Sequence, residues 1–360
     1  MNEGNCFFEL LQTALGTQQT PITFTRYEWE ACYEQAAKHS LLAIVFPVVQ
    51  KYLKNEIGQR IEPLFSQWLA TIVQVDERNR LLNERAEWLS CKFNEWGHKT
   101  CILKGQGVAR LYPSPELRQG GDIDIWVEGS QDETVKCLRD NYIVIRHIDY
   151  VHSETAFFDD VEVETHFRPS WMYNPFKNRR LQRFFRENAR AQFDNLDDIV
   201  GFAYPTIGFN LVYSLIHINR HIFEEGIGLR QLLDYYYILM HSSKEERDKA
   251  FSVICDLCLR KFAGAIMYIE GKVFSIDREL MLCAPNEKEG SFLLSEIMRG
   301  GNFGRYDERN KWFAKNQRIG RGLFNLKRNL RYMTHYPSEV LWIPIWKVWH
   351  WCWRKWKGYL

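Results

Sequence analysis

The segment that decides the fold reads RQGGDIDIWV and spans residues 118–127. Its acidic and apolar side chains alternate, which is typical of a β-strand with one buried face. Asp122 and Asp124 stand two positions apart and therefore point to the same side, while Ile123 and Ile125 point to the other. Two neighbouring carboxylates repel each other, and a divalent cation is the group that best offsets this repulsion. The segment predicts a strand that carries a pair of metal ligands.

A glycine turn comes before this strand. Residues 101–107 read CILKGQG, which predicts a short apolar strand followed by a turn at Gly105 and Gly107. Glycine lets a ligand approach the backbone closely and leaves amide N–H groups available to phosphate oxygens. Lys104 stands at the strand end, where its ammonium group either contacts a phosphate or is exposed as an ordinary surface lysine. A short helix over residues 108–112 is expected to follow, with its positive end toward an anion.

A third acid follows on a later strand. Residues 161–166 read VEVETH, and this alternation places Glu162, Glu164 and His166 on one strand face. Residues 153–158 are expected to pair with this strand in a hairpin. Glu164 is the preferred third acid, and Glu162 competes for that role. His166 either orients Glu164, lies near the acceptor of the reaction, or is a plain histidine of the sheet.

These motifs together resemble the DNA-polymerase-β-like nucleotidyltransferase superfamily, which combines a glycine turn, an Asp-x-Asp pair and a third acid on a later strand. Within it, the chain resembles the bacterial family called uncharacterised nucleotidyltransferases, over roughly residues 30–305. The matching segments are LKG at 103–105, RQGGDID at 118–124, ETH at 164–166, HINRH at 217–221 and GLRQLLD at 228–234. Two positions depart from the superfamily. Gly120 stands where Ser or Thr is common, and the third acid is Glu rather than Asp, which leaves the acceptor and the metal geometry open.

The resemblance implies an α+β fold, in which a small mixed sheet is flanked by helical regions on both sides in sequence. It also implies an enzyme that uses two metal ions, Mg²⁺ or Mn²⁺, to move an NMP from an NTP to a hydroxyl-type acceptor, with release of pyrophosphate. The acceptor is expected to be a small molecule; a protein side chain or an RNA end is the alternative. A non-catalytic nucleotide-binding module that docks on a membrane or a partner is a further alternative. The preferred base cannot be read from these motifs.

Site residues follow from the same resemblance. The expected metal ligands and catalytic residues are Asp122, Asp124 and Glu164. The expected nucleotide-binding residues are Lys104, Gly105, Gly107, Arg118, His217 and His221. For Arg118, pairing with the acidic cluster and contact with the nucleotide are equally expected.

A helix is predicted over residues 206–223, after Pro205. Asn210, Ser214, His217 and His221 recur at spacings of four, three and four and form one polar stripe on an otherwise apolar helix. The stripe is either the wall of a cleft or a solvent-exposed face. A zinc site at the two histidines is rejected, because no further ligand follows at a suitable spacing.

Two further segments carry smaller predictions. In the helix predicted over residues 229–234, Arg230 and Asp234 stand at i, i+4 and are expected to form a structural ion pair, with a role in positioning the nucleotide as the alternative. Residues 300–304 read GGNFG and follow a predicted helix over residues 292–299. They fit a helix stop, with a contact to phosphate or base as the alternative.

The whole chain suits several domains: a helical region at 1–95, the transferase core at 96–170, a helical domain at 171–308 and a basic tail at 309–360. Nine scattered cysteines favour reduced thiols and therefore a cytoplasmic protein. The N-terminal residues lack the pattern of a signal peptide, and no apolar run is long enough to span a bilayer.

Charge is concentrated in the tail. From Arg309 onward there are twelve Lys or Arg and one acid, so this segment carries +11 while the rest of the chain carries −9. Five tryptophans at 342, 346, 349, 353 and 356 form one stripe if residues 338–360 are helical, with Pro344 confining the helix to the residues after it or leaving Trp342 in the first turn. The tail is predicted either to lie on anionic lipid, peripherally at the inner membrane face, or to dock on the protein's own core or on a partner. RNA binding is a weaker alternative, and specific DNA binding is not expected.

Overall fold

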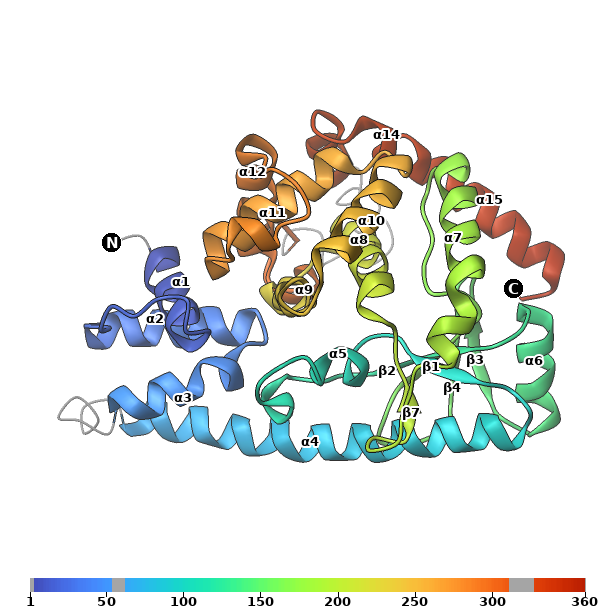
Figure 1. Ribbon diagram of the computed structural model, residues 1–360, viewed down its shortest axis with the longest axis horizontal. Helices are drawn as coiled ribbons and strands as arrows, with labels where there is room; N and C mark the ends of the chain where they lie inside the picture. Colours follow the sequence, from blue (N-terminus) through green and yellow to red (C-terminus); the bar gives the residue numbers. More distant parts are fainter. Residues whose placement is uncertain (1–2, 54–61, 311–326, 360) are drawn as a thin grey trace.

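The computed structural model describes residues 3–53, 62–310 and 327–359 and confirms the predicted α+β class. A small mixed sheet lies between a long helix below it and a group of helices above it (Figure 1). The strands are β1 (Thr100–Ile102), β2 (Ile123–Val127), β3 (Ile145–Ile148), β4 (His152–Thr155), β5 (Val163–His166), β6 (Leu196–Asp197) and β7 (Phe202–Ala203). The α-helices are α1 (Glu3–Ala14), α2 (Arg26–Lys38), α3 (Leu42–Leu53), α4 (Glu62–Glu95), α5 (Gln106–Ala109), α6 (Gln131–Asp140), α7 (Pro175–Phe193), α8 (Ile207–Glu224), α9 (Leu229–Met240), α10 (Lys244–Asp256), α11 (Arg260–Phe274), α12 (Glu287–Gly300), α14 (Pro337–Val340) and α15 (Trp342–Lys357). The short 3₁₀ turns are η2 (Pro115–Leu117), η3 (Arg278–Leu280), η4 (Asn302–Gly304) and η5 (Glu308–Asn310).

The main sheet has the strand order β1-β2-β5-β4-β3. The pair β2–β5 is parallel, and the pairs β1–β2, β4–β5 and β3–β4 are antiparallel. The predicted hairpin is present, because β4 and β5 are consecutive and antiparallel. Because β2 and β5 are parallel, a long connection must join them. Helix α6 is the first element of this connection, and its N-terminus has a capping box formed by Ser130 and Glu133. In the β2–β5 ladder Asp124 stands directly opposite Glu164.

The alternation along β2 decides which layer covers each face of the sheet. Ile123, Ile125 and Val127 belong to a buried cluster with residues of α4, among them Leu82 and Phe93. Trp126 points to the other face, where its ring lies against rings of α7 and α8. Because Asp124 has the same parity as Trp126, its carboxylate also faces the α8 layer. The strand therefore buries one face on α4 and presents its acids to the helices above.

Helix α4 connects the N-terminal helices to the sheet, along the lower edge of Figure 1. Near its start, Trp68 is fully buried and its indole N–H donates to the carbonyl of Leu42 at 2.8 Å. Toward its end, Leu82 and Phe93 pack under the strands. The helices predicted for residues 1–95 include α4, which is one continuous element from Glu62 to Glu95. The division of the chain into four parts stays a prediction, because α4 packs with both the first and the second of them.

The N-terminal helices reach the upper layer through a buried histidine. The ring of His39 is fully buried beside Phe7, and its Nδ1 accepts a hydrogen bond from the Leu229 N–H at 3.2 Å. Burial, with a further contribution from the nearby Lys38 charge, lowers the pKa of His39 to about 3. His39 is therefore neutral in the folded protein at all ordinary pH values.

This histidine is expected to make the fold sensitive to acid. Histidine in an unfolded chain has a pKa of about 6.5. Between that value and the folded value of about 3, the unfolded chain binds a proton that the folded chain does not, so stability falls as the pH drops. When the pH falls from 7 to 4.5, the free energy of unfolding should decrease in both proteins. The decrease should be about 2–3 kcal/mol smaller for His39→Gln than for the parent. Urea unfolding at both pH values measures this, with the exposed His241→Gln as control. Equal acid losses in parent and His39→Gln would contradict the assignment.

Helix α15 docks partly on the protein itself. Trp346 stacks on Trp171 with ring centroids 4.1 Å apart, and Tyr150 contacts the rings of Trp346, Trp349 and Trp353. Trp342 lies in the first helical turn together with Pro344, where a missing N–H costs nothing. The predicted docking on the protein's own core is thus confirmed for one side of the helix. No helix among residues 3–53, 62–310 and 327–359 is both long and apolar enough to cross a membrane.

Candidate functional site

Three carboxylates meet where β2 and β5 lie side by side. Asp124 and Glu164 are opposite each other in the parallel ladder, and Asp122 directly precedes β2. One carboxylate oxygen from each of these residues lies within 4.8 Å of those of the other two. Glu162 is exposed, and only its main-chain carbonyl takes part here, by accepting from the Ile123 N–H. The structure therefore brings Glu164, and not Glu162, to the Asp pair.

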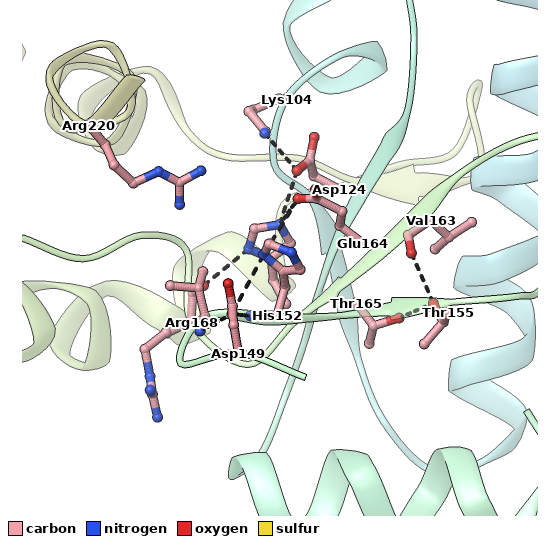
Figure 2. Close-up of polar contacts among 12 residues, drawn as sticks. Lys104, Asp124, Asp149, His152, Thr155, Val163, Glu164, Thr165, Arg168 and Arg220 are labelled. Atoms are coloured by element: carbon pink, nitrogen blue, oxygen red, sulfur yellow. Dashed lines mark hydrogen bonds and ion pairs between the residues drawn. The ribbon is translucent and has the colours of Figure 1, made fainter. Parts of the chain in front are cut away.

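Lys104 and His166 hold this cluster together, and Figure 2 shows the contact between Lys104 and Asp124. The Lys104 Nζ lies 2.7 Å from Asp124 Oδ1. The His166 Nε2 lies 3.0 Å from the same oxygen and 3.3 Å from Glu164 Oε2, while its Nδ1 lies 3.2 Å from the Arg168 carbonyl. The interpretation of His166 as a group that orients Glu164 is consistent with these contacts. Lys104 is only 21% exposed in its side chain, so the alternative of an ordinary surface lysine is wrong.

The charges of the cluster follow from these contacts. Burial opposes the charged form of His166, but its hydrogen bonds with Asp124 and Glu164 outweigh burial and raise the pKa of His166 to about 9. Burial would raise the pKa of Asp124, yet the Lys104 charge and the His166 hydrogen bond hold it below its usual value. The pKa of Glu164 is likewise held well below its usual value, against the effect of burial. For Asp122, burial and the Asp124 charge raise the pKa, and the charges of Lys104 and Arg230 offset this only in part. Asp122 is thus the carboxylate that gains most from an added cation.

The cluster opens into a cavity of about 360 Å³ between the sheet and helices α8 and α9. This volume lies in the range of small-molecule sites. The lining residues are Lys104, Gly105, Val108, Arg118, Gly121, Asp122, Asp124, Glu164, Ser214, His217, Ile218, Arg220, His221, Glu225, Arg230, Gln231, Asp234, Phe303 and Arg305. All three acids and five of the six expected nucleotide-binding residues are among them. The sixth, Gly107, lies behind the cavity.

The two glycines of the turn have different positions. Gly105 has φ 56° and ψ −112°, a backbone conformation that side chains disfavour, and it borders the cavity. Gly107 lies inside α5, where a Cβ atom would come within 2.3 Å of the Ile102 carbonyl oxygen. Close packing therefore requires glycine at 107. The predicted helix over residues 108–112 is in fact α5, which begins at Gln106 directly after the turn and ends at Ala109.

The polar stripe of α8 forms one wall of the cavity. Ser214, His217 and His221 line it, so the alternative of a solvent-exposed stripe is wrong for these three residues. Asn210 is buried instead, with its side-chain N–H₂ donating to the Pro205 carbonyl at 3.3 Å. Burial and the Lys104 charge lower the pKa of His217 well below its usual value, so its ring is neutral. His221 Nδ1 lies 2.7 Å from Glu225 Oε1.

The predicted ion pair between Arg230 and Asp234 is wrong. Asp234 instead accepts two hydrogen bonds from Arg118, from Nε and from an Nη, both at 2.7 Å, and a third from the Tyr112 hydroxyl at 2.7 Å. Arg230 donates to the Gln119 carbonyl at 2.5 Å. Two parallel bonds to one carboxylate outweigh a single contact along the helix, because the guanidinium fork matches carboxylate geometry. Arg118 thereby ties the segment before β2 to α9, and it does not pair with the acid cluster.

Several cavity residues were not predicted from the sequence. Arg220 extends from α8 toward the acids in Figure 2, and its Nε lies 3.5 Å from Glu224 Oε2. It stands three residues after His217, so a wider definition of the polar stripe would have included it. Phe303 and Arg305 enter from the segment after α12, where the C-cap residue Gly301 has φ 61°. The predicted helix stop at residues 300–304 is confirmed, and its contact with a base or phosphate stays a prediction.

A family model described as "Uncharacterised nucleotidyltransferase" matches residues 25–274. This range includes the sheet, the acid cluster, α8 and α9. No curated protein matches the chain.

Proposed function

Because the chain belongs to the uncharacterised nucleotidyltransferase family, we propose that it transfers an NMP from an NTP to a hydroxyl group of an acceptor and releases pyrophosphate. Family membership supports NMP transfer in general and an enzyme of that kind. The single observation that carries the finer proposal is the meeting of Asp122, Asp124 and Glu164 at a cavity that basic side chains also line. In the reaction, the acceptor oxygen bonds to the α-phosphorus, the bond from that phosphorus to the bridging oxygen breaks, and pyrophosphate leaves.

The donor set fits a hard divalent cation. Three carboxylate oxygens within 4.8 Å of one another match the oxygen ligands that Mg²⁺ and Mn²⁺ prefer. The pKa of Asp122 stays raised although the Lys104 and Arg230 charges lower it, so an added cation would stabilise the charged form of this carboxylate. We therefore assign Mg²⁺, or Mn²⁺, to these three residues. When bound, the metal supplies charge neutralisation at the triphosphate and lowers the pKa of the attacking oxygen.

The other cavity residues have roles that follow from their charge. Lys104 and Arg220 both line the cavity and can contact the triphosphate, and the backbone at Gly105 leaves room for a phosphate oxygen. Glu164 is ionised and can accept the proton of the acceptor hydroxyl. His166, charged at neutral pH, keeps Asp124 and Glu164 in place and does not act as a base. From α8, His217 presents a neutral ring to the nucleotide, and His221 presents a hydrogen-bonding ring.

The acceptor is proposed to be a small molecule, because the cavity is about 360 Å³ and enclosed by α8, α9 and the segment at Phe303. NTP labelled in the α-phosphate should transfer its label to an acceptor from a cell extract, whereas label in the γ-phosphate should appear in pyrophosphate. Label in small molecules supports the proposal, and label in protein or RNA assigns the alternative acceptors. Transfer of the γ-label to an acceptor would contradict NMP transfer altogether, and binding without transfer would favour the non-catalytic module.

We further propose that the protein is cytoplasmic and binds an anionic membrane surface through the outer side of α15. Leu341, Ile345 and Val348 share one helix face and are each more than half exposed, and Trp351 and Trp356 flank them. Arg179 and Arg186 of α7 are exposed and line a groove together with Trp342 and Trp349, and the exposed Arg183 is on the same helix. Apolar side chains beside a row of arginines are the features of an interfacial surface on anionic lipid. All nine cysteines are free, which is consistent with a reducing compartment.

Changing this face should weaken membrane binding. Ile345→Glu is expected to reduce binding to phosphatidylserine-containing vesicles about tenfold or more, since an isoleucine side chain contributes about 1.5–3 kcal/mol when it leaves water. Vesicle sedimentation measures the change. Ile199→Glu is the matched control, because Ile199 is 95% exposed on the turn between β6 and β7. If the parent protein does not sediment with anionic vesicles, or if both variants sediment equally, the lipid proposal fails.

A further inference from the structure

We propose that His152, His166 and Glu164 form a second cation site, which takes a transition-metal ion such as Zn²⁺ or Co²⁺ in preference to Mg²⁺. This inference goes beyond the proposed transfer reaction, whose cation is held by carboxylates alone. One ligand atom from each of the three residues lies within 4.8 Å of those of the other two. The two groups of possible ligands share Glu164, so its carboxylate lies between them.

The sheet places the two imidazoles on one face. His152 of β4 stands directly opposite His166 of β5 in the antiparallel ladder, and their ring centroids are 5.1 Å apart. Glu164 lies two residues before His166 and therefore has the same parity on β5. Paired strands in the middle of a sheet are rigid supports, so the three side chains converge without help from a loop.

The strongest observation is a buried nitrogen without a partner. The Nδ1 of His152 is shielded from water and makes no hydrogen bond, although the side chain is only 12% exposed. Its nearest acceptors are Glu164 Oε2 at 3.6 Å and Asp149 Oδ1 at 3.9 Å, which is beyond hydrogen-bond distance. A buried polar atom left unpaired is costly, and native structures usually satisfy it. A cation between His152 Nδ1 and Glu164 would satisfy it here.

The backbone at His152 is fixed, and the ring of His166 is held in the manner of a metal ligand. Asp149 Oδ1 accepts the main-chain N–H groups of Val151 at 2.6 Å and of His152 at 2.8 Å, which fixes the turn that begins β4. His166 bonds through Nδ1 to the Arg168 carbonyl, which aims Nε2 at the carboxylates. Metal-bound histidines commonly donate their second ring nitrogen to a carbonyl in this way. An ion bound here replaces the proton that His166 shares with Asp124 and Glu164.

The donor set indicates the class of ion. Two imidazole nitrogens and one carboxylate suit zinc and other first-row transition metals. Magnesium prefers oxygen ligands and keeps much of its water, so it should favour the site of Asp122, Asp124 and Glu164. The protein would then discriminate between two cations through residues only one strand apart.

Cobalt provides a test that does not depend on turnover. The intact protein is titrated with Co²⁺ alone, and its visible absorption is followed; bands of nitrogen-ligated cobalt that saturate at one ion per chain are expected. His152→Gln should weaken Co²⁺ binding at least about tenfold, the lower end of the loss seen even for residues that only support a ligand. His241→Gln, at an exposed histidine outside both sites, should leave binding unchanged. Thermal unfolding of each variant verifies that it is folded.

A comparison with Mg²⁺ separates the two sites. Calorimetric Mg²⁺ binding should change little in His152→Gln and should weaken strongly in Asp122→Asn. Absence of cobalt bands in the parent protein would overturn the inference whatever the variants do, and so would equal Co²⁺ binding by the parent and His152→Gln. Cobalt binding that depends on His152, in a protein that releases no pyrophosphate, would uphold this site and reject the proposed transfer. If the protein releases pyrophosphate and its cobalt binding does not depend on His152, the proposed transfer is upheld and this site is rejected.

Discussion

Glu164→Gln is expected to lower the rate of pyrophosphate release about a thousandfold, a loss of about 4 kcal/mol in transition-state stabilisation. The substitution removes one of three carboxylates from the cluster at the cavity and the group proposed to accept the acceptor's proton. It also takes away one of the two carboxylates that His166 contacts. The measurement is the steady-state rate with each NTP at saturating Mg²⁺ or Mn²⁺.

The matched control lies two residues away. Glu162→Gln makes the same chemical change on the same segment, but this side chain is exposed and outside the cavity lining. Its rate should stay within about threefold of the parent, as expected of a surface position that contacts neither metal nor substrate. A large loss in Glu162→Gln with little loss in Glu164→Gln would reverse the assignment of the third acid.

Arg118→Met should destabilise the fold by about 3–5 kcal/mol, because it leaves the buried Asp234 carboxylate without its cation. The side chains of Arg118 and Asp234 are 5% and 13% exposed, and two bonds of 2.7 Å join them. Arg118→Met/Asp234→Asn should lose less than the sum of the two single variants, since it removes both charges. Chemical denaturation measures all three free energies of unfolding.

An exposed pair serves as the comparison. Arg80→Met breaks the contact with Asp76 at a position where the arginine side chain is 74% exposed, so the expected change is within about 0.5 kcal/mol. Additive losses in the Arg118 and Asp234 variants would show that the two side chains are not coupled. In that case, Arg118 would be available for the nucleotide contact that the sequence also allowed.

The acid cluster could be predicted from the sequence because it depends on local rules. Alternation along residues 122–127 placed the two Asp side chains on one face, and the same rule placed Glu164 with His166. The choice between Glu162 and Glu164 could not be made this way, since residues two apart on a strand are equivalent. It required the register between β2 and β5, in which Asp124 meets Glu164. Register across a long connection is a tertiary property.

Contacts between distant segments were beyond the sequence for the same reason. The spacing of Arg230 and Asp234 predicted a helical ion pair, but Arg118, from 116 residues away, forms the stronger fork. Arg220 joins the cavity only because α8 lies with that side toward the sheet. The approach of Phe303 to the same cavity depends on how the chain turns after Gly301.

The tail shows how a single pattern can have two uses. The sequence predicts that the tryptophan stripe forms one helix face, which contacts either lipid or the protein's own core. In the structure, Trp346 packs on Trp171, whereas Trp356 is 80% exposed. The residues that make the outer face continuous, Ile345 and Val348, were not part of the stripe. The side of an apolar helix that packs on the protein is determined by the shape of the surface against which it packs.

The most direct test of the central claim is pyrophosphate release with each of the four NTPs and Mg²⁺ or Mn²⁺, in the presence of a broad acceptor panel. The parent protein is compared with Asp122→Asn/Asp124→Asn, which keeps the size of both side chains and removes both charges. The account predicts release by the parent with at least one NTP and a loss of at least about a thousandfold in the double variant. Release that persists in a folded double variant would contradict the proposed role of the acid cluster.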